Sequence, residues 1–227
     1  TPLSNFETNQ GYRDRQDPSL TLSLKLKGRG DEEILVWTTT PWTLPSNMAL
    51  AVGAEIDYVL VELEEKKRWL AESRLAAYSK AKEPLEVIER KRGTELAGWE
   101  YEPLFDLIPD HPLLYKIQLA TFVSTEDGTG VVHIAPSFGE DDFQLGKELG
   151  LPLFDPLDSE GKFTSLAPLW EGVGAKEADK TIIAQLKEEG RILRHETILH
   201  SYPHCYRTGV PLLYRALKTW FLRLDVE

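Results

Sequence analysis

The sequence has little cysteine and no long apolar run. Its 227 residues include one cysteine, Cys205, so no disulfide can form within the chain and a site of several thiolates is excluded. So few cysteines are typical of cytosolic proteins, so we expect a cytoplasmic location. No stretch approaches the roughly 18 apolar residues of a membrane-spanning helix, so no membrane partner is expected. The start has neither a basic segment nor an apolar core, which predicts no signal peptide, and the missing initiator methionine suggests an excised or processed piece.

Nucleotide-binding motifs are also missing. Gly128-Thr129-Gly130 and Gly172-Val173-Gly174 both lack the third glycine of a dinucleotide fingerprint, and the sequence has no phosphate-binding loop ending in Gly-Lys-Ser/Thr. We therefore expect no cofactor in this chain.

Positive charge is in short supply. Lys and Arg number 26 against 37 Asp and Glu, which gives a net charge of −11. An acidic field repels polyanions at long range, so this protein is not expected to find nucleic acid by electrostatic steering. The protein could still bind the end of a nucleic acid locally if another protein segment delivers that end.

The remaining composition is that of an ordinary globular protein, with 41% apolar and 28% charged residues. Alternation and β-branched runs predict strands, a 3.6-residue period predicts helices, and Asp127-Gly128 predicts a hairpin turn. Many short strands with few helices indicate a β-rich mixed α/β fold, with a β-barrel core and peripheral helices. The predicted strands are 20–26, 34–37, 58–61, 85–91 and 191–199, the hairpin joins 119–124 to 130–134, and the helices are 66–80, 141–149 and about 175–190.

The first candidate functional segment is threonine-rich. It runs from Thr38 through Thr39, Thr40, Trp42 and Thr43 to Asn47, and it contains two prolines that disfavour helix in the residue before each. We expect an extended, rigid loop whose hydroxyls orient a water or a ribose. The competing interpretation is a surface strand edge, because threonine favours strands.

The second candidate segment follows a predicted strand, whose His133 precedes a turn with Phe138 and Gly139. A helix then begins with Glu140, Asp141 and Asp142. Acidic residues at a helix start are favoured by the helix dipole and by capping, which accounts for Glu140 and Asp141. Asp142 lies one position deeper, where it can turn back to His133 and hold a substrate cation. A metal site made of His133 and these acids is the alternative.

The third candidate segment, His200 to Cys205, holds two histidines and the thiol. Zinc needs four ligands that the chain does not evidently offer, so a polar arm is the favoured interpretation and no metal site is predicted.

The segments Thr38–Asn47 and Gly128–Asp142 together resemble the editing domain of isoleucyl-tRNA synthetases, the insertion called connective polypeptide 1 in this class I aminoacyl-tRNA synthetase family. The resemblance covers essentially the whole chain. It implies residues 1–19 as an N-terminal linker arm, 20–199 as the editing domain and 200–227 as a C-terminal arm toward an absent catalytic body.

The resemblance implies hydrolysis of the ester of valine mischarged on tRNA(Ile), and of valyl-adenylate as a further substrate. One methylene separates valine from isoleucine and is worth roughly 1–3 kcal/mol in a binding pocket, a limit for which this family is the familiar worked example. A second pocket that is too small for isoleucine removes the error. The implied catalytic residues are Asp142, Thr38, Thr39 and Thr43, and the implied substrate-binding residues are Thr40, Trp42, Asn47, His133, Phe138, Gly139 and Glu140.

The family resemblance also sets the expected partners and limits. The expected partners are the acceptor end of tRNA(Ile), carrying valine, and the catalytic body, which would supply most phosphate contacts. The expected oligomeric state is a monomer. The ATP-binding signatures of the class are absent here, so ATP and Mg²⁺ would serve only the full-length enzyme. Thr208 stands where many relatives have a second cysteine, which puts zinc at Cys205 in doubt. The rival interpretations are a non-catalytic tRNA-positioning fragment and a metal-dependent hydrolase using His133 and Glu140–Asp142.

Overall fold

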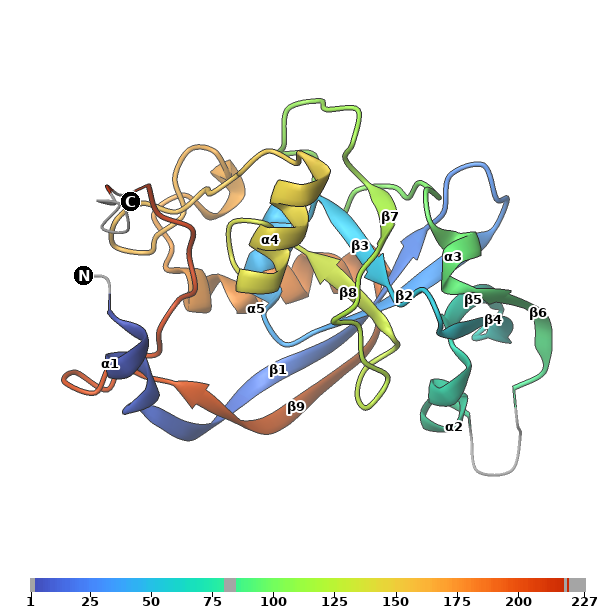
Figure 1. The fold of residues 1–227 in the computed structure, drawn as a ribbon, viewed down its shortest axis with the longest axis horizontal. Helices are drawn as coiled ribbons and strands as arrows, with labels where there is room; N and C mark the ends of the chain where they lie inside the picture. Colours follow the sequence, from blue (N-terminus) through green and yellow to red (C-terminus); the bar gives the residue numbers. More distant parts are fainter. Residues whose placement is uncertain (1–2, 80–84, 219, 221–227) are drawn as a thin grey trace, which may run out of the picture.

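The computed structural model describes residues 3–79, 85–218 and 220. Its strands form one mixed sheet that curls into a half-barrel, with the helices at the periphery (Figure 1). The predicted fold class is confirmed, although the barrel stays open. The strands are β1 (Tyr12–Lys25), β2 (Glu32–Thr38), β3 (Ala49–Val52), β4 (Asp57–Leu63), β5 (Lys66–Ala71), β6 (Val87–Arg92), β7 (Lys116–Leu119), β8 (Val131–Ile134) and β9 (Ile192–Pro203).

The helices are short except for two. They are α1 (Asn5–Asn9), η1 (Pro41–Ser46), η2 (Glu72–Arg74), α2 (Leu75–Tyr78), α3 (Gly93–Leu96), α4 (Glu140–Leu149), η3 (Pro168–Trp170) and α5 (Ala175–Glu188), where η marks a 3-10 helix. α4 and α5 match the predicted helices. No helix among the described residues is long and apolar enough to cross a bilayer.

The sheet runs in the order β6-β4-β5-β2-β8-β3-β7, and β1 joins it beside β2. β2 pairs in parallel with β5 and with β8, and β3 pairs in parallel with β7, whereas the other pairs are antiparallel. β8 thus lies between β2 and β3. This order brings the end of the threonine-rich strand beside the strand that carries His133.

β1 and β9 form a long antiparallel ribbon that continues beyond the sheet (Figure 1). Its register runs from Tyr12 opposite Pro203 to Leu22 opposite Ile192. The predicted domain boundaries after residue 19 and before residue 200 therefore fall inside paired strands. The prediction of an irregular arm is wrong for residues 200–203, because these residues pair with β1.

The alternating leucines of β1 are buried, and Thr21 and Ser23 between them are buried as well. Thr21 and Tyr78 share a hydrogen bond of 2.9 Å between their hydroxyls, and Ser23 donates to the carboxylate of Glu33. These bonds satisfy the polar groups, so both faces of the strand can be covered. Alternation of apolar and polar residues is typical of a strand with one buried face, whereas β1 is covered on both faces over this stretch.

The predicted helix over 66–80 is wrong for its first half. Lys66–Ala71 is β5, which pairs with β4 through a turn at Glu64 and Glu65, both with positive φ (51° and 61°). Such a turn matches the twist of two antiparallel strands. Trp69 and Leu70 are fully buried by this pairing, which outweighs the helical period of the segment. Residue 80 lies outside the described residues.

The predicted hairpin between 119–124 and 130–134 is also wrong. β7 and β8 do not pair with each other, because β3 lies between them and pairs with both. Residues 120–130 instead form a loop. Gly128 and Gly130 have positive φ in this loop (66° and 74°), and a side chain on either would meet Trp37 or Ala71.

The threonine-rich segment is not the extended loop that was expected. Thr40 is outside the helical region (φ −127°, ψ 71°), as its following proline predicts, but Pro41–Ser46 forms the buried 3-10 helix η1. α5 packs against η1, and Asp179 of α5 accepts a hydrogen bond of 2.8 Å from the backbone N–H of Trp42. This bond satisfies a donor at the start of η1.

Removing that acceptor should loosen η1. Asp179→Ala leaves the buried N–H of Trp42 without a partner, which costs about 1–3 kcal/mol of unfolding free energy in urea titrations. Asp179→Asn keeps an acceptor oxygen in the same place and should stay close to the wild type. Equal losses in the two variants would contradict the proposed anchoring.

Candidate functional site

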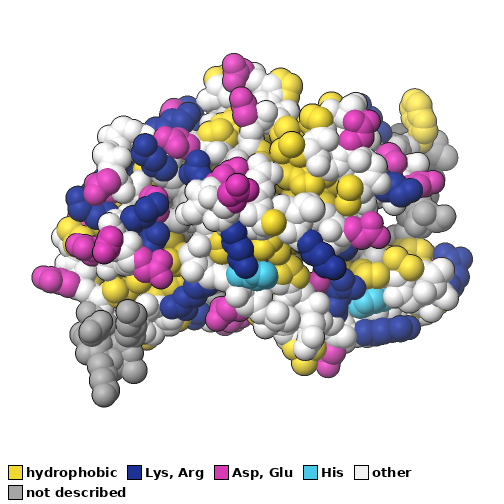
Figure 2. Space-filling view, turned by 180° about the vertical axis from the view of Figure 1, so that it is seen from behind, with side chains coloured by type: hydrophobic (Ala, Val, Ile, Leu, Met, Phe, Trp, Pro, Cys, Tyr) yellow, Lys and Arg dark blue, Asp and Glu magenta, His cyan; other side chains and the backbone are white. Residues whose placement is uncertain are grey.

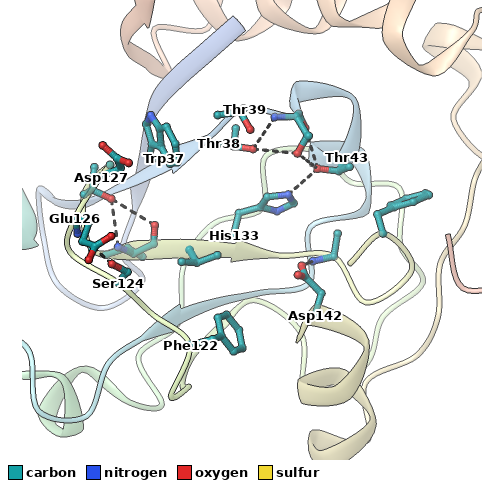
Figure 3. Close-up of a pocket in the computed structure, with 18 residues that line it drawn as sticks. Trp37, Thr38, Thr39, Thr43, Phe122, Ser124, Glu126, Asp127, His133 and Asp142 are labelled. Atoms are coloured by element: carbon teal, nitrogen blue, oxygen red, sulfur yellow. Dashed lines mark hydrogen bonds between the residues drawn. The ribbon is translucent and has the colours of Figure 1, made fainter. Parts of the chain in front are cut away.

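One cavity collects most of the predicted site residues. It measures about 440 Å³ and lies between the end of β2, β8, the 120–130 loop and the start of α4 (Figure 3). Lys and Arg are absent from its lining, whereas three carboxylates are present, so the cavity favours a cationic group. The lining residues are Trp37, Thr38, Thr39, Thr40, Thr43, Phe122, Ser124, Glu126, Asp127, Gly128, Thr129, Gly130, Val131, Val132, His133, Ala135, Phe138 and Asp142.

The threonine hydroxyls form a connected network along one wall. Thr38 Oγ1 accepts a hydrogen bond of 3.1 Å from the backbone N–H of Thr40, and it lies 3.3 Å from Thr40 Oγ1. Thr40 Oγ1 lies 3.2 Å from Thr43 Oγ1, and Thr43 donates to the backbone carbonyl of Thr40 at 2.8 Å. Because Thr38 and Thr40 line the cavity, this network offers hydroxyl groups to a ligand oxygen or a water.

His133 of β8 lies beside this wall and points toward Thr43 (Figure 3). Its Nε2 is 2.8 Å from Thr43 Oγ1, and its Nδ1 is 3.2 Å from Asn47 Nδ2. Burial lowers the pKa of His133 to about 4, so the ring is neutral at pH 7. With both ring nitrogens hydrogen-bonded, His133 serves as a wall and a hydrogen-bond partner rather than as a base or a metal ligand.

Asp142, the third residue of α4, turns back to the end of β8. Its Oδ1 accepts a hydrogen bond of 2.7 Å from the backbone N–H of Ala135, and burial raises its pKa to about 6. A Cβ on Gly139 would lie 2.5 Å from Asp142 Oδ2. The glycine therefore makes room for the carboxylate, which is ionised in most molecules at pH 7 and faces the cavity.

The structure brings Thr38, Thr39, Thr40, Thr43, His133, Phe138 and Asp142 to this one cavity. Trp42, Asn47, Gly139 and Glu140 are not in its lining. Trp42 is buried behind Phe138, with ring centroids 5.0 Å apart, so it supports a residue of the lining instead of lining the cavity itself. Asn47 is buried behind His133, and Glu140 is exposed at the start of α4.

Sequence reasoning missed the wall opposite the threonines. Trp37, Phe122, Ser124, Glu126 and Asp127 line the cavity because the 120–130 loop folds over the end of β2. Glu126-Asp127-Gly128 was interpreted as a hairpin turn, and no pattern in the sequence marks Phe122. The long loop between two strands was the available signal, since such loops often carry function.

The metal interpretations find no support in the geometry. Among residues 3–79, 85–218 and 220, no group of three or more His, Cys, Asp or Glu side chains is placed to hold a metal ion. Near Cys205, His204 Nδ1 bonds the carbonyl of Tyr202, and hydrogen bonds from Thr208 lower the pKa of the thiol to about 7. Asp141 lines a different cavity, on the outer side of α4.

The buried carboxylate of Asp142 should make stability depend on pH. Because its pKa is raised in the folded state, its contribution to stability is present below about pH 4 and is lost as pH rises through about 6. Asp142→Asn keeps the acceptor for Ala135 without the charge. The difference in unfolding free energy, variant minus wild type, should therefore increase as the pH is raised from 4 to 7.

Urea unfolding at several pH values measures this difference. Glu140→Gln is the matched control, because Glu140 is exposed at the start of the same helix and is not among the charges that raise the pKa of Asp142. A difference between Asp142→Asn and wild type that stays constant over this range would contradict the assignment.

Comparisons with known proteins identify relatives of this chain. No protein-family model matches the sequence. The isoleucine–tRNA ligase of Bdellovibrio bacteriovorus is 47% identical over 230 residues, which cover 99% of this chain and 22% of the relative. That of Corynebacterium diphtheriae is 45% identical over 245 residues, which cover 99% of this chain and 23% of the relative. The chain thus spans about a fifth of the length of these curated relatives.

Solved structures share the fold at low identity. The editing domain of P. knowlesi cytosolic leucyl-tRNA synthetase has a TM-score of 0.57 at 13% identity and covers 84% of this chain and 98% of its own. The P. falciparum domain has a TM-score of 0.59 at 10% identity and covers 79% of this chain and 99% of its own. The chain is therefore homologous to a segment of isoleucine–tRNA ligases and has the fold of a leucyl-tRNA synthetase editing domain.

Proposed function

We propose that this chain hydrolyses the ester that joins valine to tRNA(Ile), and valyl-adenylate as a further substrate, while it excludes isoleucine by size. The observation that carries the proposal is the position of Asp142. Its carboxylate faces the same cavity as the threonine hydroxyls, and no lysine or arginine lines that cavity. The similarity to isoleucine–tRNA ligases and the editing-domain fold support an editing role.

In this proposal, Asp142 binds the α-ammonium of the aminoacyl ester. Its Oδ1 is held by the N–H of Ala135, and Gly139 leaves space beside Oδ2. A charge-assisted hydrogen bond in a half-buried site is stronger than a neutral one. The ammonium would in turn favour the ionised form of Asp142. Binding the ammonium fixes the ester carbonyl relative to the threonines of the opposite wall.

Hydrolysis by a positioned water fits the side chains at hand. His133 is neutral and hydrogen-bonded at both nitrogens, so it cannot activate a serine or cysteine nucleophile. Thr38, Thr39 and Thr40 instead offer hydroxyls to the carbonyl oxygen, the terminal ribose and the water. Positioning of the water and the ester supplies the acceleration.

Size selection is assigned to the apolar side of the cavity. Phe138 and the buried ring of His133 bound the space next to Asp142, and Trp42 supports Phe138 from behind. These groups pack against the hydrophobic core, so moving them apart would cost packing free energy. An extra methylene forced into such a site costs about 1–3 kcal/mol and displaces the ester from the reacting position.

Delivery of the tRNA is assigned to the rest of a longer enzyme, a catalytic body that would bind ATP and Mg²⁺. The chain carries a net charge of −11, and Figure 2 shows acidic and basic side chains interspersed over one face. A surface with this net negative charge repels RNA at long range, so the isolated domain should bind tRNA weakly. Within this proposal the domain works in the cytoplasm as a monomer.

Deacylation of Val-tRNA(Ile) by the purified chain tests the proposal. Asp142→Asn should lose about 10- to 100-fold in kcat/KM, because a charge-assisted bond contributes roughly 1.5–3 kcal/mol. The neighbouring Asp141→Asn should stay near wild type, and a chelator should have no effect. Hydrolysis that depends on the chelator would favour the metal-dependent hydrolase. Absence of hydrolysis at any concentration would favour a tRNA-positioning fragment.

Size exclusion has its own test. His133→Ala removes a ring that borders the cavity, so Ile-tRNA(Ile) should become a substrate while Val-tRNA(Ile) is still hydrolysed. Rates on both esters, each on the same tRNA, give the ratio. Unchanged discrimination in this variant would remove His133 from the proposed sieve.

A further inference from the structure

A line of hydrogen bonds leads from the buried core to the threonine wall of the cavity. Tyr101 donates from its hydroxyl to Asn47 Oδ1 at 2.7 Å, and Asn47 Nδ2 lies 3.2 Å from His133 Nδ1. His133 Nε2 lies 2.8 Å from Thr43 Oγ1. Neither Tyr101 nor Asn47 lines the cavity, and Tyr101 is fully buried.

Two neighbours hold the Asn47 amide in one orientation, Tyr101 at its oxygen and Ala49 at its nitrogen. Asn47 also lies 3.0 Å from the backbone carbonyl of Ala49, and a carbonyl can only accept. The amide nitrogen must therefore face Ala49 and His133, and the amide oxygen must face Tyr101. Burial keeps the pKa of Tyr101 well above its usual value, so its hydroxyl remains a donor.

This orientation determines the tautomer of His133. Because Nδ1 accepts from Asn47, the ring proton is on Nε2 and is donated to Thr43. Thr43 then donates its own proton to the carbonyl of Thr40. Thr43 is thus an acceptor toward Thr40 Oγ1. Thr40 uses its single hydroxyl proton on Thr43 and Thr38 uses its own on Thr40, so the cavity side is left with the free lone pairs of these hydroxyls.

We propose that Tyr101 is a positioning residue for the reaction: acting through Asn47, it holds the His133 proton on Nε2 and so directs the hydroxyl proton of Thr43 to the carbonyl of Thr40, which lines the cavity. The part of this inference that concerns activity rests on the proposed function. With the other tautomer, Thr43 would donate to His133 and would no longer donate to the carbonyl of Thr40. Thr40, which lines the cavity, would then be held at this carbonyl only by the backbone N–H of Thr43.

The chain contains a matched control for the hydroxyl of Tyr101. Tyr115 packs edge-on against Tyr101, with ring centroids 5.9 Å apart. Its hydroxyl is buried without a hydrogen-bond partner among the described residues. Tyr101→Phe and Tyr115→Phe therefore remove the same atom from adjacent rings, but only the first breaks the line to His133.

The experiment is ¹⁵N NMR of the chain labelled at histidine, with His133 assigned by the His133→Gln variant. Wild type and Tyr115→Phe should show His133 protonated on Nε2 only. Tyr101→Phe should show a measurable Nδ1-protonated population, and Asn47→Asp, which can only accept, should place the proton on Nδ1. Deacylation of Val-tRNA(Ile) should fall about tenfold in kcat for Tyr101→Phe and stay unchanged for Tyr115→Phe.

Two outcomes would overturn the proposal. One is an unchanged tautomer in folded Tyr101→Phe, whatever its activity, and the other is an equal effect of Tyr115→Phe. If Tyr101→Phe does not fold, retention of the Nε2 proton in Asn47→Asp overturns it instead. The tautomer readout needs no substrate, so a chain that fails to hydrolyse Val-tRNA(Ile) would count against the proposed function and leave this inference standing on the NMR result.

Discussion

The four-residue strand β8 joins the two halves of the site because it pairs with β2 on one edge and with β3 on the other. The pairing with β2, through Trp37 and Val132, brings the threonine segment alongside. The pairing with β3 puts His133 opposite Leu50, a short distance along the chain from Asn47. The end of β8 supplies the N–H of Ala135 that holds Asp142. A change that displaces this strand would therefore move the threonines, His133 and Asp142 apart at the same time.

The electrostatics of the cavity follow from burial rather than from opposite charges. Asp142 has no cationic side chain beside it in the cavity, and His133 is kept neutral by its surroundings. A buried carboxylate without a cation costs free energy, and a ligand that brings an ammonium recovers it. The site is thus prepared for a positive charge that the protein does not itself supply.

Much of the fold and part of the site follow from local sequence patterns. Helices α4 and α5 end or begin at glycines, and their apolar period is regular, so both were predicted. The helical period of Ala71, Leu75 and Tyr78 led to a predicted helix from residue 66, but residues 66–71 form β5, because pairing with two strands buries Trp69. Local patterns contain no information on such partners. For the same reason the predicted hairpin was wrong, since β3 lies between its two strands.

The β1–β9 ribbon brings the two ends of the domain side by side. Tyr12 and Pro203 face each other across an antiparallel pair, although 190 residues lie between them. The entropy of closing so long a loop is offset by the strand pairing of the domain itself. After Pro203 the chain returns to the domain, where Arg215 pairs with Asp155 and the N–H of Ala216 donates to the carbonyl of Ser137. The segment that follows the ribbon is therefore fixed next to the turn that carries Phe138, so a displacement of this segment would be transmitted to the cavity wall.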